Sequence, residues 1–343
     1  MKNLSYFYLR ALIATCSTLV SVTFALVMYP KLVTLSGEIL GTSSDVKIIT
    51  LEHMQKRQSG NLKYYYEPPA NTTTTNEADW LPYVATYKHN EDGLHDLTNY
   101  ALEKPSNVVR ILTLGDSFVY GMFVNTEDNF SELFEQMLNN KLTCPQITRF
   151  EILNLGVAGY DIQYSVERFI KKGLKYNPDI VLWYIRDDDF FLINEQIMER
   201  EIYFSSQLET SESALLNTNE DKKSKATTLA YDEFYGKIKS IRSNEERQAY
   251  IEPEMASFSR LVKAYSGPLV VFTFPDTPEE YKGYINELIQ NNQNGNIRYF
   301  DEFPDIETFH PYDYHPTARG HKTIADTLYQ FLIDSPVLSC NSS

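Results

Sequence analysis

The stretch Val108–Gly121, VVRILTLGDSFVYG, decides the fold of this chain. Its first seven residues are apolar or β-branched apart from one arginine, and the run stops at Gly115-Asp116-Ser117. This pattern is typical of a buried strand that ends in a tight turn and leads into a helix. Because open α/β sheets bind ligands at the carboxyl ends of their strands, Ser117 is a candidate nucleophile. Taken alone, the tripeptide favours the simpler interpretation, in which Ser117 caps the next helix and Gly115 makes the turn.

Strand and helix patterns alternate along the rest of the chain. Further strands are expected at 150–155, 180–185, 269–274 and 297–300, and helices at about 130–138, 162–174, 278–290 and 324–332. Strands that alternate with helices imply a parallel sheet. The sequence therefore predicts an α/β domain over residues 107–334, built as a three-layer α/β/α sandwich of the flavodoxin-like kind.

The composition supports a full hydrophobic core. The chain has 343 residues, of which 43% are hydrophobic and 13% aromatic, enough for one large domain with additional segments. Its formal net charge is -15, from 31 Lys and Arg against 46 Asp and Glu. Phosphate backbones bind to clustered cations, so nucleic acid is excluded as a partner.

Residues 11–30 contain no charged side chain, and as a helix of about 30 Å they would match the thickness of one membrane. We therefore expect residues 1–31 to form a cytoplasmic tip and a single transmembrane anchor, with a cleaved signal peptide as the alternative. Lys2 and Arg10 precede the span and only Lys31 follows it closely, which places the amino terminus in the cytoplasm. The remaining chain is then periplasmic or extracellular.

Three segments fall outside the alternating pattern. Residues 32–106 contain Pro68-Pro69 and a polar run, and we expect a stalk and an irregular lead-in without chemistry of its own. Residues from about 195 to 242 are polar and mixed in charge, typical of a solvated loop; a mobile lid or a flap that binds an envelope protein is the alternative. Residues 335–343 form a tail. In an oxidising compartment, Cys144 and Cys340 are candidates for a disulfide.

A serine hydroxyl needs a base to accept its proton, and that base needs a partner that fixes its tautomer. His315, with Asp313 close before it, supplies both groups. A surface histidine before a proline is the alternative interpretation of His315. His310 and His321 are rival candidates, although His321 falls inside the last predicted helix, where packing against a neighbour is expected.

Four ordered blocks resemble those of the SGNH (GDSL-type) hydrolases, and their positions after successive strands make the match specific. The blocks are Gly115-Asp116-Ser117-Phe118 with Gly121, Asn154-x-Gly156-x-x-Gly159, Pro178-Asp179-Ile-Val-Leu leading to Asp188-Asp189, and Asp313-x-His315-Pro316 with Gly320-His321. The lead-in from Asn90 to Arg110, which includes Gly93, resembles the membrane-anchored bacterial branch found with cell-surface polysaccharides.

The resemblance implies a role for each matched residue. Ser117 attacks an acyl carbonyl, His315 is the base and Asp313 orients it, while the amides of Ser117 and Gly159 donate to the oxyanion. The family commonly places its aspartate three residues before the histidine, where this chain has Tyr312. The closer spacing seen here at Asp313 also occurs in membrane-associated relatives.

Asp188 departs from the family, which has an asparagine whose side-chain amide donates to the oxyanion at this position. A carboxylate cannot donate, and losing one such donor typically costs about 10²- to 10³-fold in rate. Three outcomes stay open: a protonated Asp188 donates, Arg186 replaces the donor, or the site is degenerate. The acidic run 187–189 also suggests a divalent cation, but consecutive side chains point in different directions. We expect no metal and no cofactor.

The sequence therefore predicts an exported serine esterase that acts on acyl esters, with O-acetyl groups of a surface glycan as the expected substrate. An O-acyltransferase would use the same acyl-enzyme. A catalytically degenerate protein of this fold would instead bind glycan as a scaffold. A lipase with an interfacial lid ranks last, because the insertion contains little apolar sequence beyond Ala214-Leu215-Leu216.

Overall fold

A computed structural model describes residues 55–56, 62–142, 144–191, 193–210, 219–240, 244–292 and 296–338. All of them belong to one compact unit that spans residues 46–343. The predicted membrane anchor, residues 1–31, lies outside the described residues. Within the described part of the chain, the helices are too short or too polar to cross a bilayer.

The described core contains a five-stranded parallel sheet with the strand order β6-β5-β7-β8-β9. The strands are β5 (Val108–Leu114), β6 (Arg149–Asn154), β7 (Ile180–Tyr184), β8 (Leu269–Phe272) and β9 (Ile297–Phe300). The order reverses between β5 and β7, and this is where doubly wound sheets bind their ligands. Ser117 follows β5 directly, so it lies at this switch point.

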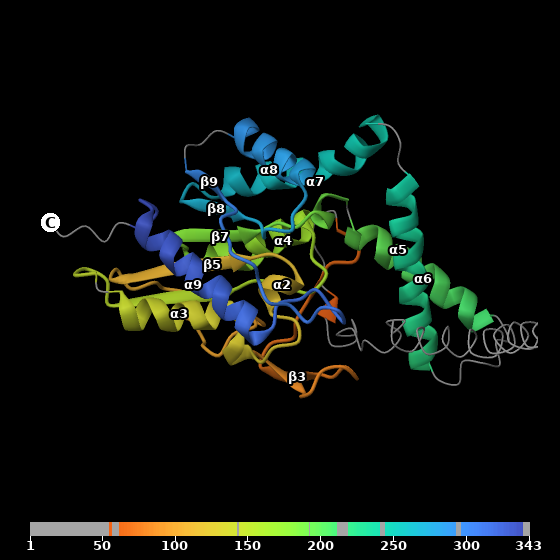
Figure 1. Cartoon of the computed structure of the whole chain (residues 1–343), viewed down its shortest axis with the longest axis horizontal. Helices are drawn as coiled ribbons and strands as arrows, with labels where there is room; N and C mark the ends of the chain where they lie inside the picture. Colours follow the sequence, from red (N-terminus) through yellow and green to blue (C-terminus); the bar gives the residue numbers. More distant parts are fainter. Residues whose placement is uncertain are drawn as a thin grey trace, which may run out of the picture. The chain divides into compact units, whose positions relative to one another are not determined.

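Helices cover both faces of the sheet, which confirms the predicted α/β/α sandwich (Figure 1). One face packs against α3 (Phe130–Lys141) and α9 (Ala318–Asp334). The other packs against α4 (Ile162–Arg168), α7 (Asn244–Ala264) and α8 (Glu279–Asn291). A π-helical turn (Phe169–Gly173) and a 3₁₀ turn (Leu174–Tyr176) extend α4, and further 3₁₀ turns cover Thr126–Asp128 and Asp188–Phe191.

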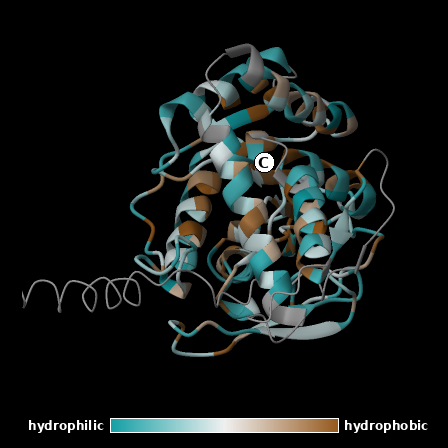
Figure 2. Ribbon diagram, turned by 90° about the vertical axis from the view of Figure 1, so that its right-hand side faces the viewer, coloured by the Kyte–Doolittle hydropathy of each residue, from teal (hydrophilic) through white to brown (hydrophobic). Residues whose placement is uncertain are grey.

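The sequence pattern explains why both faces are covered. Along β5, Leu112 and Leu114 pack on the α4 side, while Ile111 packs on the α3 side. Side chains of a strand alternate between faces, so a nearly continuous apolar run must be buried on both. The helices carry hydrophobic and hydrophilic residues on different sides, as Figure 2 shows, and bury the former against the sheet.

The lead-in, expected to be irregular, contains a β-hairpin. β3 (Thr72–Asn76) pairs antiparallel with β4 (Ala85–His89), and the two-residue strands β1 (Gln55–Lys56) and β2 (Tyr66–Glu67) also pair. The prediction of an irregular segment is wrong for these residues. The missed signal is the period-two pattern of Ala85, Tyr87 and His89, whose side chains are all buried.

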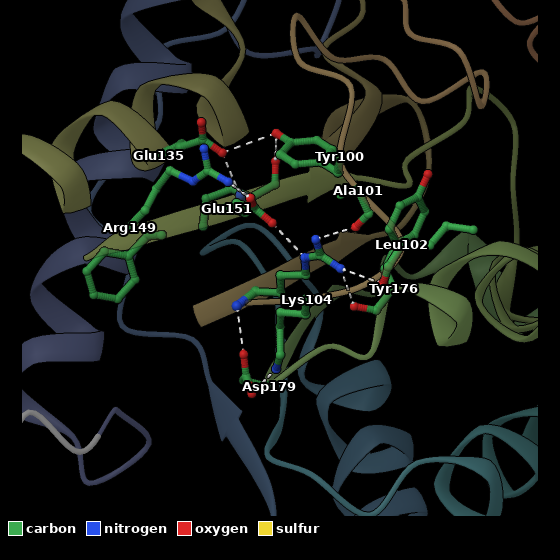
Figure 3. A network of polar contacts seen from close by, with 12 residues as sticks. Tyr100, Ala101, Leu102, Lys104, Glu135, Arg149, Glu151, Tyr176 and Asp179 are labelled. Atoms are coloured by element: carbon green, nitrogen blue, oxygen red, sulfur yellow. Dashed lines mark hydrogen bonds and ion pairs between the residues drawn. The ribbon is translucent and has the colours of Figure 1, made fainter. Parts of the chain in front are cut away.

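Arg110 ties the lead-in to the sheet. Its side chain is 0% exposed and lies opposite Glu151 on β6, to which its Nε donates at 2.6 Å. Its remaining N–H groups donate to the carbonyl oxygens of Ala101, Leu102 and Tyr176 (Figure 3). A buried guanidinium is stable only when its charge and its donors are satisfied in this way.

The insertion expected to be a solvated loop is helical over much of its length. It contains α5 (Ile193–Thr210) and α6 (Asn219–Ser240), which pack against each other and lead into α7 (Figure 1). The prediction of a loop over about 195–242 is therefore wrong for residues 195–210 and 219–240. Whether this helical pair acts as a lid or as a partner-binding flap stays a prediction.

Cys144 is buried and disulfide-bonded. Cys340 lies outside the described residues, as does the end of the tail after residue 338. The pairing of these two cysteines stays a prediction.

Candidate active site

The turn after β5 presents Ser117 as the first residue of α2 (Ser117–Tyr120). Gly115 adopts a φ of +151°, and a Cβ there would lie 2.6 Å from the Val119 side chain and 3.0 Å from the Tyr184 carbonyl oxygen. The Asp116 carboxylate caps the helix by accepting the Phe118 N–H at 2.8 Å. The N–H groups of a first helical turn have no partner within the helix. The Ser117 amide is therefore oriented for an acceptor outside it.

Ser117, His315 and Asp313 form one chain of hydrogen bonds. The Ser117 Oγ lies 2.6 Å from His315 Nε2, and His315 Nδ1 lies 2.5 Å from Asp313 Oδ1. Because the Asp313 carboxylate accepts, Nδ1 carries the proton and Nε2 is left to accept from the serine hydroxyl. Burial opposes ionisation of Asp313, but the hydrogen bonds and charge of His315 hold the pKa of this carboxyl below its ordinary value.

The loop that carries Asp313 and His315 is stabilised by hydrogen bonds within its own backbone. The Phe309 N–H donates to the His315 carbonyl oxygen at 3.0 Å, and the Tyr312 N–H donates to the Phe309 carbonyl oxygen at 3.0 Å. Asp313 also accepts the His315 backbone N–H at 2.7 Å. The rings of Phe118 and Phe123 contact the imidazole at 4.7 and 5.5 Å between centroids. The histidine is thus fixed by packing as well as by its carboxylate.

The two rival histidines lie elsewhere. His321 is fully buried, accepts the Phe130 N–H at 3.3 Å and stacks on that phenyl ring, and burial lowers its pKa to about 3. His310 lies before a cis proline and contacts Tyr314, at 5.5 Å between ring centroids. The structure therefore brings only His315 of the three to the Ser117 hydroxyl. Tyr312, three residues before His315, is 65% exposed, and its ring stacks on that of Trp80.

A cluster of carboxylates surrounds one cation beside Ser117. The Arg186 Nε lies 3.4 Å from Asp187 and 3.6 Å from Asp188, and its guanidinium lies 4.9 Å from the centre of the Phe118 ring. Burial raises the pKa of Asp116 to about 6, although the charge of Arg186 opposes this rise. Burial likewise raises the pKa of Asp188, again against the effect of Arg186.

The acidic run 187–189 does not converge on one point. Asp187 and Asp188 face Arg186, whereas Asp189 is buried and accepts the Arg186 backbone N–H at 2.7 Å. Asp189 thus closes the turn after β7. Consecutive residues in a tight turn point in different directions, so the three carboxylates have different partners. They are not arranged to bind one cation together.

The second block of the sequence motif braces the serine turn. The Asn154 side chain donates to the Val119 carbonyl oxygen at 2.9 Å and accepts the Gly156 N–H at 2.9 Å. A Cβ on Gly156 would lie 2.5 Å from the Tyr120 nitrogen, so only glycine fits there. Gly159 lies further along, exposed, with a φ of +77° in the turn before α4.

Two histidines of the lead-in contact the end of α2: His89, the last residue of β4, and His95, which follows the hairpin. Sequence reasoning missed both contacts. His89 Nε2 lies 2.9 Å from the Tyr120 hydroxyl, and His95 Nδ1 lies 2.5 Å from the Tyr120 carbonyl oxygen. The second ring nitrogen of His95 lies 2.8 Å from the Thr126 hydroxyl. Burial lowers the pKa of His89 to about 4 and that of His95 to about 3, so both rings are neutral. No local sequence signal announces these contacts, because they join residues about 30 positions apart.

The insertion also reaches the site. The Tyr235 hydroxyl of α6 lies 3.5 Å from Oδ2 of Asp188, one of the residues predicted for the oxyanion site. This contact was not foreseen either, since the segment was expected to be a loop.

A parallel sheet with a serine, histidine and aspartate at its carboxyl edge defines the class of α/β hydrolytic proteins. The model of the GDSL-like Lipase/Acylhydrolase family matches residues 111–328, and the chain belongs to this family. It is thus an ester hydrolase by class.

Several solved structures are similar to this chain at low identity. A putative lipolytic protein of the G-D-S-L family from Desulfitobacterium hafniense is 16% identical, covers 65% of this chain and 99% of its own, and has a TM-score of 0.38. A psychrotrophic esterase from Pseudoalteromonas sp. is 13% identical, with coverages of 66% and 97% and a TM-score of 0.40.

A mutant of an acetylxylan esterase from Geobacillus stearothermophilus is 13% identical, with coverages of 68% and 97% and a TM-score of 0.37. A search of curated proteins finds no match.

Proposed function

We propose that this protein is an exported serine esterase that removes acyl groups, in particular O-acetyl groups, from a surface glycan through an acyl-enzyme on Ser117. The hydrogen-bonded chain from Ser117 through His315 to Asp313 carries this proposal. The resemblance of the lead-in to membrane-anchored proteins of polysaccharide metabolism supports the glycan, and the uncharged residues 11–30 support export through an N-terminal anchor.

In the proposed reaction, the Ser117 oxygen bonds to the acyl carbon while its proton moves to His315 Nε2. The carbonyl becomes an oxyanion, and its collapse breaks the bond to the sugar oxygen, which takes the proton from His315. Water then attacks the acyl carbon and gives a proton to His315. Collapse of this second oxyanion breaks the bond to the Ser117 oxygen, which takes that proton back, and the acid leaves. Asp313 keeps Nδ1 protonated and stabilises the imidazolium at both stages. A sugar hydroxyl in place of water would make the same site an O-acyltransferase.

The oxyanion needs donors, and Asp188 removes the one that the family supplies. We assign the missing stabilisation to Arg186, whose guanidinium lies against the Phe118 ring next to Ser117. The amides of Ser117 and Gly159 would provide the remaining donors. Asp187 and Asp188 hold the guanidinium in place, and they also reduce its net charge. The site is therefore expected to work, at a lower rate than one with the asparagine.

Asp188 also supports a second candidate, a degenerate protein that binds glycan without turning it over. A fluorophosphonate probe separates the two, because it labels only an activated serine. Stoichiometric labelling of the purified full-length protein, mapped to Ser117 and absent in Ser117→Ala, is expected. If the folded wild-type protein stays unlabelled and releases no acetate from any ester, the esterase proposal is wrong.

A further inference from the structure

Exposed aromatic rings gather beside His315, on two segments that are far apart in the sequence. Tyr312 and Tyr314, each 65% exposed, flank Asp313 on the histidine loop. Trp80 lies in the connection between β3 and β4 and is partly exposed. The Trp80 and Tyr312 rings are parallel within 2°, with centroids 5.9 Å apart. We call this pair the stacking surface.

The stacking surface is continuous with the catalytic histidine. Trp80 contacts Phe123 at 4.9 Å and Phe309 at 5.3 Å between ring centroids, and Phe123 contacts His315 at 5.5 Å. Any ligand resting on Tyr312 is therefore only a few side chains away from the reacting serine. Exposed rings that had gathered on a loop by chance would not have to be connected to His315 through such contacts.

Phe123 shows that the lead-in hairpin holds this arrangement against a backbone cost. Its φ of +66° lies in the left-handed region, which is rare and unfavourable for a bulky residue. Two hairpin tyrosines keep it there: the Phe123 N–H donates to the Tyr87 hydroxyl at 2.8 Å, and the Tyr83 hydroxyl donates to the Phe123 carbonyl oxygen at 2.8 Å. Such strain is found where the surrounding structure positions a functional group.

From this geometry we propose that Trp80 and Tyr312 form a subsite on which the pyranose ring that carries the ester stacks, with its acyl group directed at Ser117. A pyranose has one face of C–H groups and a polar rim, and it matches an aromatic ring that is apolar on its face and polar at its edge. The subsite rests on the proposed esterase activity, and it gives the lead-in hairpin a role in recognising the substrate.

Hydrolysis of two esters tests the subsite in the full-length protein. Glucose pentaacetate presents a pyranose ring, whereas ethyl acetate is too small to reach the stacking surface. In Tyr312→Ala and Trp80→Ala, the ratio of kcat/KM for glucose pentaacetate to that for ethyl acetate should fall on the order of tenfold. Tyr203→Ala is the matched control, because Tyr203 is 45% exposed on α5 and contacts Arg200 and Phe204; it should leave the ratio unchanged.

Binding is measured independently through fluorescence. The chain has two tryptophans, and Trp183 is 1% exposed under Phe258, so acrylamide quenching reports mainly on Trp80. In the Ser117→Ala protein, glucose pentaacetate should protect Trp80 from quenching, and the additional change Tyr312→Ala should abolish the protection.

The outcomes separate the subsite from the esterase itself. If wild-type protein cleaves ethyl acetate, yet the ratio is unchanged in both variants or glucose pentaacetate gives no protection, the subsite is wrong and the esterase stands. If the variants lose ethyl decanoate hydrolysis instead, the surface holds an acyl chain and the proposal is equally wrong. If neither ester is cleaved and Ser117 is not labelled, the esterase proposal fails, whatever the quenching of Trp80 fluorescence shows.

Discussion

Arg186→Met is the most informative single change at this site. Methionine keeps a long apolar side chain against Phe118 but removes the charge that lies beside the serine turn. If Arg186 supplies the stabilisation that Asp188 cannot, this variant should lose kcat while KM changes little, since an oxyanion forms only in the transition state.

The size of the loss follows from the surroundings of the guanidinium. A unit charge about 4 Å from the oxyanion, at an effective dielectric constant of about 20, is worth about 4 kcal/mol. Asp187 and Asp188, 3.4 and 3.6 Å from the Arg186 Nε, cancel part of this charge. With about 3 kcal/mol remaining, kcat should fall about 10²-fold, because each 1.4 kcal/mol is about a factor of ten.

The assay is acetate release from ethyl acetate, with kcat and KM determined separately and folding checked by circular dichroism. Arg186→Lys should keep part of the rate, because it retains a point charge without the planar donors. Asp188→Asn in the Arg186→Met background should recover most of the loss, because it restores an amide donor. A folded Arg186→Met protein with kcat within about threefold of wild type would refute this role of Arg186.

Four further changes, with Arg319→Met as a control, test the site and the residues that support it. Ser117→Ala and His315→Ala should each abolish acetate release, and near-normal turnover in either would end the proposed mechanism. Arg110→Met should lower the free energy of unfolding in urea by about 3 kcal/mol, because it leaves the buried Glu151 carboxylate with only the half-exposed Arg149 and takes the donor from three carbonyl oxygens. The exposed Arg319→Met should cost less than about 1 kcal/mol. For His95, burial lowers the folded-state pKa to about 3, against about 6.5 when unfolded. The unfolded chain therefore binds the extra proton between these values, and stability falls by about 1.4 kcal/mol per pH unit on acidification below pH 6.5. His95→Gln should remove this contribution, so equal slopes in variant and wild type would contradict it.

The sheet and its flanking helices could be predicted because their signals are local. The apolar run of β5 and its stop at Gly115 appear in the sequence, and so does the stripe of α3. The helices of the polar insertion could not be predicted, because their signals are not local. α5 and α6 lack a strong apolar stripe of their own and are paired with each other, so their helicity depends on packing that no local pattern records.

The residues of the candidate site also form two groups, those with a sequence motif and those without one. Ser117, Asp313 and His315 were recognised from ordered motifs, and the structure brings their side chains together although Ser117 and His315 are 198 positions apart. Their catalytic roles stay predictions. Trp80, His89 and Tyr235 had no motif, because each acts through a contact with a distant segment.

The sequence by itself determined where the strands of the parallel sheet end and which serine follows the first of them. Periodicity and turn chemistry are properties of neighbouring residues, so they can be read along the chain. Only the tertiary structure decided that Arg186 lies beside Phe118 and that the lead-in hairpin holds α2 and carries Trp80 to the histidine loop. These contacts join side chains from separate helices, strands and loops. They form only when the layers of the fold have packed against one another.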